Sequence, residues 1–302
     1  MTKPSRKHHY LPRHYLRGFA DQAGTFFVYD KLTGRVFHTS PDAAFFENDL
    51  NTVTFPDGSS SDFLEGLYAD TESQAWNSLD KIRQSTPDAP IDLWHKMDLF
   101  LFLSFLHWRL PSNVTYAEKL SERSFGQDKE LGFFKLTSTT GAAPPQDIID
   151  TIRTSPAWRK AAKAIVPFAP FYAGNSWYKD LANWRFAYPA DDSSWNIVGD
   201  NPIVTRGYND HDPATCLKDF LFPVSGRILL ISRGERLGEM LPPEFTVQYD
   251  TAILERSQRF VACQDKAFLS ALVDYHTFHV QSGKTDRIIP ELFEMLGRAD
   301  EG

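Results

Sequence analysis

The feature that most constrains this chain is the run "LFLFLSFLHWRLP" at 99–111. Helical spacing predicts one helix from about Ile91 to Leu110, which stops at Pro111. The middle of this helix is apolar all round, which is typical of a helix buried inside a globular protein. Its apolar part, "LFLFLSFLHW" at 99–108, is about half the ~20 residues needed to cross a bilayer, so we expect a soluble protein without a membrane partner.

The composition is consistent with one large domain. Of the 302 residues, 42% are hydrophobic and 14% aromatic, so the chain can bury a substantial core. We expect a single domain over 1–302. The net charge of −7 argues against binding nucleic acid through overall surface charge. A local basic patch remains open, because five cations precede the first acid in the chain: Lys3, Arg6, Lys7, Arg13 and Arg17.

The two cysteines, Cys216 and Cys263, lie far apart and have no zinc-binding spacing. They therefore indicate neither a disulfide framework nor a structural zinc site. The first residues also lack the apolar run of a secretory signal, because Pro12, Arg13 and His14 interrupt it. We therefore expect a cytoplasmic location.

The order of strand and helix patterns predicts an α+β fold. Two β-rich runs flank "KLTG", and Gly34 suits the tight turn between them, so an N-terminal β-hairpin is expected. A strand that ends in a Pro-Asp-Gly turn should follow within 50–61. From Ser61 the period becomes helical, which predicts a long amphipathic helix over 62–84.

A central helical bundle that contains the buried helix should come next, followed by a C-terminal mixed β/α portion. We expect a helix within 112–136, an exposed loop at 137–147, and helices at 146–154, 156–166 and 170–180. Strand patterns return in "WRFAYPA", "WNIVGDNPIV", "LFPVSGRILLISR" and "RFVACQ". Helices near 244–256, 265–276 and 290–298 complete the chain. This order favours α+β over alternating βαβ units.

Six blocks occur in a characteristic order: "HHYLPRHYLRGFAD", "VYDKLTG", "DFLEGLYADTESQAW", "FLFLSFLHWRLPSN", "WNIVGDNPIV" and "FLFPVS". Together they resemble the bacterial family called domain of unknown function 4238, over about 7–270. The first family motif is matched by six residues: His9, Tyr10, Pro12, Tyr15, Leu16 and Phe19. Its arginine before proline corresponds to Arg109, and its Ser/Thr-Asp-Asn-Pro segment to 199–202, where Gly199 replaces the usual hydroxyl residue. The resemblance implies motif boundaries and a fold, and no particular activity.

The opening stretch 7–21 combines imidazole, guanidinium and aromatic side chains. Imidazole titrates near neutrality and guanidinium binds phosphate through paired hydrogen bonds, so His9 is a candidate catalytic residue and Arg13 a candidate substrate contact. Pro12 favours a helix from itself to about Ala20. His8 and His9, in extended backbone, point to opposite sides, so one at most enters a given pocket. The alternative is that His9 is partly buried and structural.

The predicted helix 62–84 carries two carboxylates at the border of its apolar face. At about 100° per residue, Glu65 and Glu72 lie within about 20° of each other and roughly 10 Å apart along the axis. They are candidate catalytic residues or ligands for Mg²⁺ or Mn²⁺, although a third ligand is then needed, such as Asp200, His9 or Glu47. The alternative is a salt bridge to an arginine.

Arg109 ends the most apolar helix, and an unpaired buried charge is very costly, so it must reach solvent or a carboxylate. Glu65 and Glu72 are the obvious partners, and Arg109 is also a candidate substrate-binding residue. The "GDNPIV" segment places Asp200 and Asn201 in a turn after a strand. Turn chemistry alone explains these residues, but strand ends also present site residues, so Asp200 is a candidate catalytic group and Asn201 a candidate substrate contact.

Common catalytic motifs do not occur in the sequence, since it contains no GxxxxGK[ST], GxGxxG after a strand, GxSxG or HExxH. Two hypotheses remain open. The first is a hydrolase, such as a nuclease, that acts on a nucleic acid or nucleotide through the candidate residues above. The second is a binding or partner-sensing protein, with a protein partner, in which the same histidine, arginine and glutamate residues form a structural network.

Overall fold

The computed structural model describes residues 6–124, 145–172, 177–190, 196–207, 216–233 and 240–297. Its strands are β1 Lys7–His9, β2 Phe26–Asp30, β3 Arg35–Thr39, β4 Phe46–Asn48, β5 Val53–Thr54, β6 Ser60–Ser61, β7 Arg185–Pro189, β8 Val198–Gly199, β9 Val204–Thr205, β10 Phe220–Ser225, β11 Ile228–Ile231, β12 Met240–Leu241 and β13 Phe260–Cys263.

The helices begin with α1 Arg13–Arg17, α2 Phe63–Arg83, α3 Leu93–Arg109, α4 Pro111–Ser124 and α5 Gln146–Thr154. They continue with α6 Pro156–Ala161, α7 Ala169–Tyr172, α8 Trp177–Ala182, α9 Pro243–Arg256, α10 Lys266–Gln281 and α11 Thr285–Met295. Short 3₁₀ turns lie at η1 Pro41–Ala43, η2 Ala162–Ala164 and η3 Val166–Phe168. The fold is α+β, as the sequence predicts.

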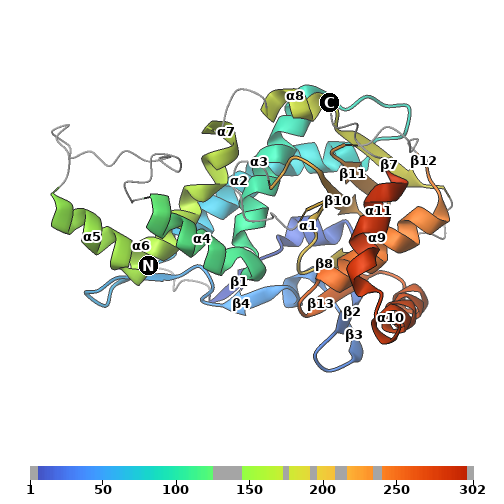
Figure 1. The fold of residues 1–302 in the computed structure, drawn as a ribbon, viewed down its shortest axis with the longest axis horizontal. Coiled ribbons are helices and arrows are strands. Elements are labelled where there is room, and N and C mark those ends of the chain that lie inside the picture. Colours follow the sequence, from blue (N-terminus) through green and yellow to red (C-terminus); the bar gives the residue numbers. More distant parts are fainter. Residues whose placement is uncertain are drawn as a thin grey trace.

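Two open sheets organise the β part of the molecule (Figure 1). One has the strand order β12-β7-β11-β10-β9, and the other has the order β3-β2-β13-β8. The predicted N-terminal hairpin is β2–β3, whose turn contains Gly34 at a positive φ of 68°. Strand β13 lies between β2 and β8, so the hairpin and a late segment of the chain share one sheet.

Helix α3 is the buried helix of the bundle. Asp92 caps its start by accepting a hydrogen bond from the His95 N–H, and buried residues occupy most of its length from Leu99 to Arg109. It packs along α2, and both helices contribute to the largest hydrophobic cluster. Among the described residues, no helix is both long and apolar enough to cross a membrane.

The segment before the first hairpin is tied to the centre of the fold. Helix α1 follows Pro12, as predicted, and the buried Tyr15 donates its hydroxyl proton to the Pro223 carbonyl at 2.8 Å. Arg83 at the end of α2 donates to the carbonyls of His14 and Tyr15, at 3.1 and 2.8 Å. A Cβ at Gly18 would come within 2.5 Å of this guanidinium, so a larger residue there would have to displace the end of the Arg83 side chain.

Several helix boundaries differ from the sequence predictions. The helix predicted at 156–166 is divided into α6 and two 3₁₀ turns, and Pro167, which lacks an N–H, lies within the second turn. Helix α11 begins at Thr285 and includes Pro290, where the prediction began the helix. Most of the predicted loop at 137–147 and the end of the helix predicted at 112–136 lie outside the described residues.

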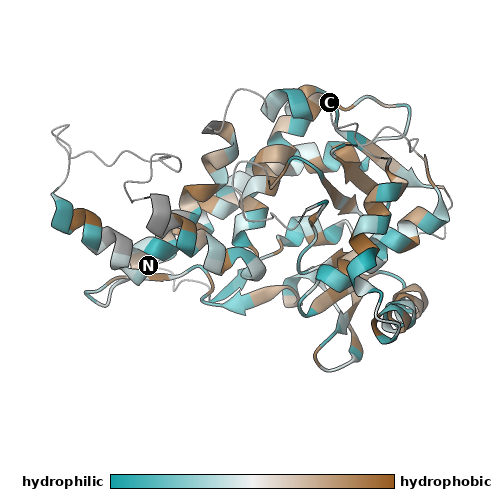
Figure 2. Cartoon of the chain, viewed as in Figure 1, coloured by the Kyte–Doolittle hydropathy of each residue, from teal (hydrophilic) through white to brown (hydrophobic). Residues whose placement is uncertain are grey.

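Helices lie at both ends of the molecule in Figure 1. Figure 2 shows both teal and brown along α5, which projects away from the sheets in Figure 1. On the opposite side, α10 and α11 both pack against α9, and α9 contacts strands of both sheets. The bundle and the sheets meet where β1, α1 and the end of α3 come together, and that region holds most of the predicted site residues.

Candidate functional site

Arg109 is buried at the end of α3, and both of its terminal nitrogens donate to neighbouring groups. Its Nη1 donates to the Glu72 carboxylate, and its Nη2 donates to the His9 carbonyl. The guanidinium also lies 4.7 Å from the centre of the Tyr68 ring, as a cation–π contact requires. The prediction that Arg109 pairs with a carboxylate of α2 is confirmed, and the partner is Glu72.

Glu65 has a different partner, because it lies two helical turns before Glu72. Its Oε1 accepts a hydrogen bond from Asn51 Nδ2 at 2.5 Å and lies 3.8 Å from His8 Nδ1. That same His8 nitrogen accepts the backbone N–H of Asn51 at 3.0 Å, so the proton of a neutral His8 ring is on Nε2. His8 is buried and is therefore the histidine of β1 that reaches the carboxylates of α2.

His9 points the other way from His8, as the extended backbone of β1 requires. Its ring lies 5.6 Å from the Phe46 ring, and its buried Nε2 has no hydrogen-bond partner. Burial lowers the pKa of His9, and the charges of Arg13 and Arg109 lower it further. Arg13 itself is exposed and pairs with Asp42 at 3.3 Å. Arg13 therefore does not join the network that surrounds Arg109.

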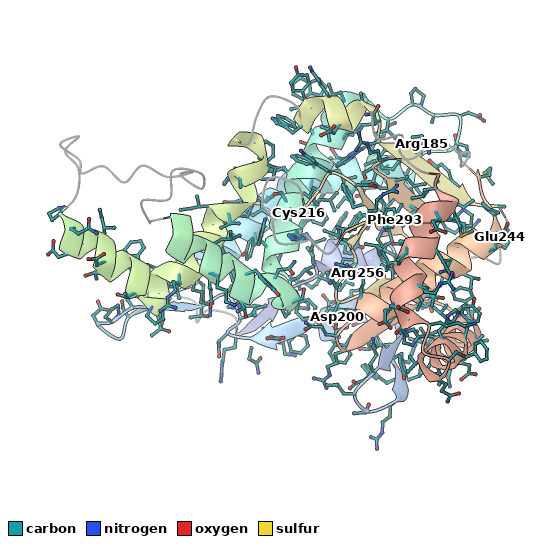
Figure 3. All side chains as sticks on the ribbon, in the orientation of Figure 1. Arg185, Asp200, Cys216, Glu244, Arg256 and Phe293 are labelled. Carbon is teal, nitrogen blue, oxygen red and sulfur yellow. The ribbon has the colours of Figure 1, made fainter. Side chains whose placement is uncertain are left out.

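Asp200 lies apart from α2, near strands β8 and β13 (Figure 3). Its buried carboxylate accepts the backbone N–H groups of Gln258, Arg259 and Phe260 at 2.8, 2.7 and 2.9 Å. Burial raises the pKa of Asp200, against the opposing effect of these three hydrogen bonds. Asp200 thus fixes the turn before β13, and Asn201 beside it is partly exposed.

The described residues do not bring together the three ligands that an Mg²⁺ or Mn²⁺ site on α2 would need. Among the described residues, no three His, Cys, Asp or Glu side chains are grouped as metal ligands would be. The Glu72 carboxylate already accepts a hydrogen bond from Arg109, and the Asp200 carboxylate accepts hydrogen bonds from three backbone N–H groups. The structure therefore brings Glu65, Glu72 and Arg109 together around β1, but it does not add Asp200 to them.

Sequence reasoning missed a buried lysine. Lys163 lies in η2 and is 0% exposed, and its Nζ makes no hydrogen bond. Burial lowers the pKa of Lys163 to about 8, with Lys160 and Arg109 lowering it further and Glu118 and Glu47 opposing them. The available signal was a lysine inside the apolar run "AAKAIVPF", at a position where a helix that packs on the bundle must bury its side chain.

Lys163 and its charged neighbours form what we call the Lys163 cluster. Its cations are Lys160, Lys163 and Arg109, and its anions are Glu118 and Glu47. We include His9, because Arg109 donates to its carbonyl and lowers the pKa of its ring. Three of its nitrogens are buried without a hydrogen-bond partner: Lys163 Nζ, His9 Nε2 and Arg109 Nε. Buried polar groups are normally satisfied, so this concentration of unsatisfied nitrogens distinguishes the cluster from ordinary core.

The fold and this network define an α+β protein whose histidine, arginine and glutamate motifs meet beside the buried helix. The chain belongs to the family described as "Protein of unknown function (DUF4238)", whose model matches residues 7–267. Comparisons with curated proteins and with solved structures found no match.

Proposed function

We propose that this protein binds a phosphate-containing ligand, such as a nucleotide or a nucleic-acid end, at the Lys163 cluster. The observation that carries the proposal is the fully buried Lys163 ammonium without a hydrogen-bond partner. A buried cation without a partner destabilises a fold, and a ligand phosphate would supply both the missing charge and the missing acceptors.

The neighbouring cations support an anion as the ligand. Arg109 and His9 each have one buried nitrogen free to donate, since a protonated His9 carries a proton on Nε2. Lys160, one turn before Lys163, is partly exposed, so the cluster extends toward solvent. Glu118 and Glu47 offset part of the positive charge, yet the pKa of Lys163 is still lowered. Burial is the main cause of this lowering, and an anion in contact with Lys163 would supply the partner that the buried ammonium lacks.

We extend this proposal to catalysis, in which the protein hydrolyses the bound phosphate ester. Glu65 is the carboxylate of α2 that is more exposed, with 28% of its side chain accessible against 16% for Glu72. It accepts from Asn51 and has no arginine partner in the described part of the chain. Glu65 is therefore the proposed base that activates a water molecule. His9 is the proposed contact to the phosphate.

A second candidate is a binding or partner-sensing protein without turnover. The engagement of Glu72 by Arg109, and of Asp200 by backbone N–H groups, favours it, because those candidate residues already have structural roles. A protein partner, a cytoplasmic location and a single domain over 1–302 remain predictions.

The test is a binding titration of the purified chain with inorganic phosphate, a nucleoside monophosphate and short single-stranded DNA and RNA, at constant ionic strength. We expect saturable binding of at least one phosphate ligand, and its loss in Lys163→Met. Lys96→Met is the matched control, because Lys96 is half-buried but donates to the Trp184 carbonyl at 2.9 Å. Equal loss of binding in both variants, or no binding by the parent, would refute the proposal.

Turnover separates the two candidates. Phosphate release from the bound ligand that falls at least tenfold in Glu65→Gln, with binding intact, supports hydrolysis. If the parent binds the ligand but releases no phosphate, the result supports a binding or partner-sensing protein without turnover. The Glu65→Gln side chain can still accept from Asn51, which preserves the local hydrogen bond.

A further inference from the structure

A cavity of about 250 Å³ lies between Tyr10, β4, the start of α4 and the turn before β13. Its polar and charged lining residues are Tyr10, Glu47, Ser112, Asp200, Gln258 and Arg259. Aromatic walls are added by Phe46 and Phe260. The proposal that follows does not depend on the function of the Lys163 cluster.

Tyr10 is the first sign that this cavity takes a ligand. The residue is only 3% exposed and lines the cavity, and its hydroxyl makes no hydrogen bond within the described part of the chain. Burial raises the pKa of Tyr10, and the negative charges of Asp200 and Glu47 raise it further. The hydroxyl is held neutral, so it can accept a hydrogen bond from a ligand.

The charge of the cavity favours a cation. Glu47 and Asp200 contribute two carboxylates, whereas Arg259 is already paired with Asp30 at 3.2 Å. Glu47 is exposed and makes no ion pair among the described residues, so its carboxylate oxygens can accept from a ligand while its charge also acts on Lys163.

The aromatic walls also suit a cation. Lys7 Nζ lies 4.7 Å from the centre of the Phe46 ring, and the Arg259 guanidinium lies 4.5 Å from that of Phe260. Both rings thus already attract cations of the chain itself, as the negative face of an aromatic ring does. Aromatic rings combined with carboxylates and a hydroxyl are the groups that recognise an alkylammonium ion.

We propose that this cavity binds a small alkylammonium ion, whose N–H groups donate to Glu47 and the Tyr10 hydroxyl and whose alkyl chain lies against Phe46 and Phe260. Asp200 contributes negative potential rather than a hydrogen bond, because three backbone N–H groups already occupy its oxygens. A volume of about 250 Å³ limits the ligand to a small molecule.

The test is isothermal titration of the full chain with propylammonium chloride and with 1-propanol, at equal ionic strength. The alcohol has a similar alkyl chain but no charge. We expect saturable binding of propylammonium at millimolar concentration or below, and at least tenfold weaker binding of 1-propanol. Glu47→Gln should weaken propylammonium binding about tenfold, since it removes one charged acceptor. Tyr10→Phe, which removes only the hydroxyl, should weaken it severalfold.

Asp70→Asn is the matched control for Glu47→Gln, because it removes one exposed carboxylate from α2, outside the cavity. It should bind propylammonium like the parent. The proposal is overturned by equal affinity for propylammonium and 1-propanol, by equal effects of Glu47→Gln and Asp70→Asn, or by the absence of saturable binding. Circular dichroism of each variant verifies that the fold is retained.

Discussion

Replacement of Lys163 by methionine should stabilise the protein at neutral pH. The fold lowers the pKa of Lys163 from the ordinary 10.5 to about 8. A difference of about 2.5, at 1.36 kcal/mol for each pH unit, corresponds to about 3 kcal/mol lost when the charged side chain is buried. Methionine has a similar shape and no charge, so Lys163→Met should raise the free energy of unfolding at pH 7 by about 2–3 kcal/mol.

The effect should depend on pH, and its sign follows from proton binding. Between about pH 8 and 10.5 the unfolded chain retains the proton of Lys163 and the folded chain has released it. The free energy of unfolding of the parent therefore rises with pH through this window. The difference between Lys163→Met and the parent should be largest near pH 7 and shrink toward zero by about pH 10.

The assay is urea unfolding at a series of pH values between about 7 and 10. Lys96→Met serves as the control and should lower stability, because it removes a lysine that donates to a backbone carbonyl. A Lys163→Met variant that is less stable than the parent at pH 7 would refute the reasoning. A stability difference that stays constant across the series would also refute it, since the charge of Lys163 would then be compensated in the fold.

Three further perturbations test the structural roles assigned above. Arg109→Ala leaves a carboxylate unpaired and should lower the free energy of unfolding by about 3–5 kcal/mol, measured by urea unfolding, and a loss below about 1 kcal/mol would contradict the buried ion pair. Gly199→Ser should cost about 1–3 kcal/mol, because a Cβ there would lie 1.9 Å from Ser257 Oγ, and adding Ser257→Gly should restore most of it. If the two losses simply add, the contact is not the cause. The pKa of Glu255 is lowered by the hydrogen bond from His276 at 2.6 Å, so its stabilisation is present above about pH 4.5 and is lost as the pH falls through the folded value. The melting temperature of the parent should fall below about pH 4.5, and that of Glu255→Gln should fall less. If the melting temperatures of the two proteins fall in parallel with pH, this role of Glu255 is refuted.

The helices that could be predicted most closely are those whose signals are local. The spacing of apolar residues and a proline place the buried helix at about 91–110, and the structure has α3 at Leu93–Arg109. The predicted helix at 62–84 is α2, Phe63–Arg83. The hairpin β2–β3 followed from its turn glycine. Each of these elements depends on residues within about one helix or hairpin length of each other.

The sequence does not show which strands pair when they lie far apart along the chain. Strand β13 lies against β2, with Phe260 opposite Asp30, and an alternating apolar pattern does not identify its partner. Which histidine turns inward follows from the pairing of β1 with β4, where His8 lies opposite Glu47. Sequence spacing shows that His8 and His9 point apart, but the burial of His8 depends on a strand some forty residues later.

The same limit applies to the choice of residues for functional tests. Asp200 was a sound candidate from its place in a turn, and it does line a cavity. Its carboxylate also holds three backbone N–H groups at the start of β13, so Asp200→Ala would leave them unsatisfied and weaken the turn. Loss of any activity in that variant would therefore not separate a catalytic role from a structural one. Glu47 and Tyr10 face the same cavity without such hydrogen bonds, and substitutions at these two positions can test the site while leaving the turn intact.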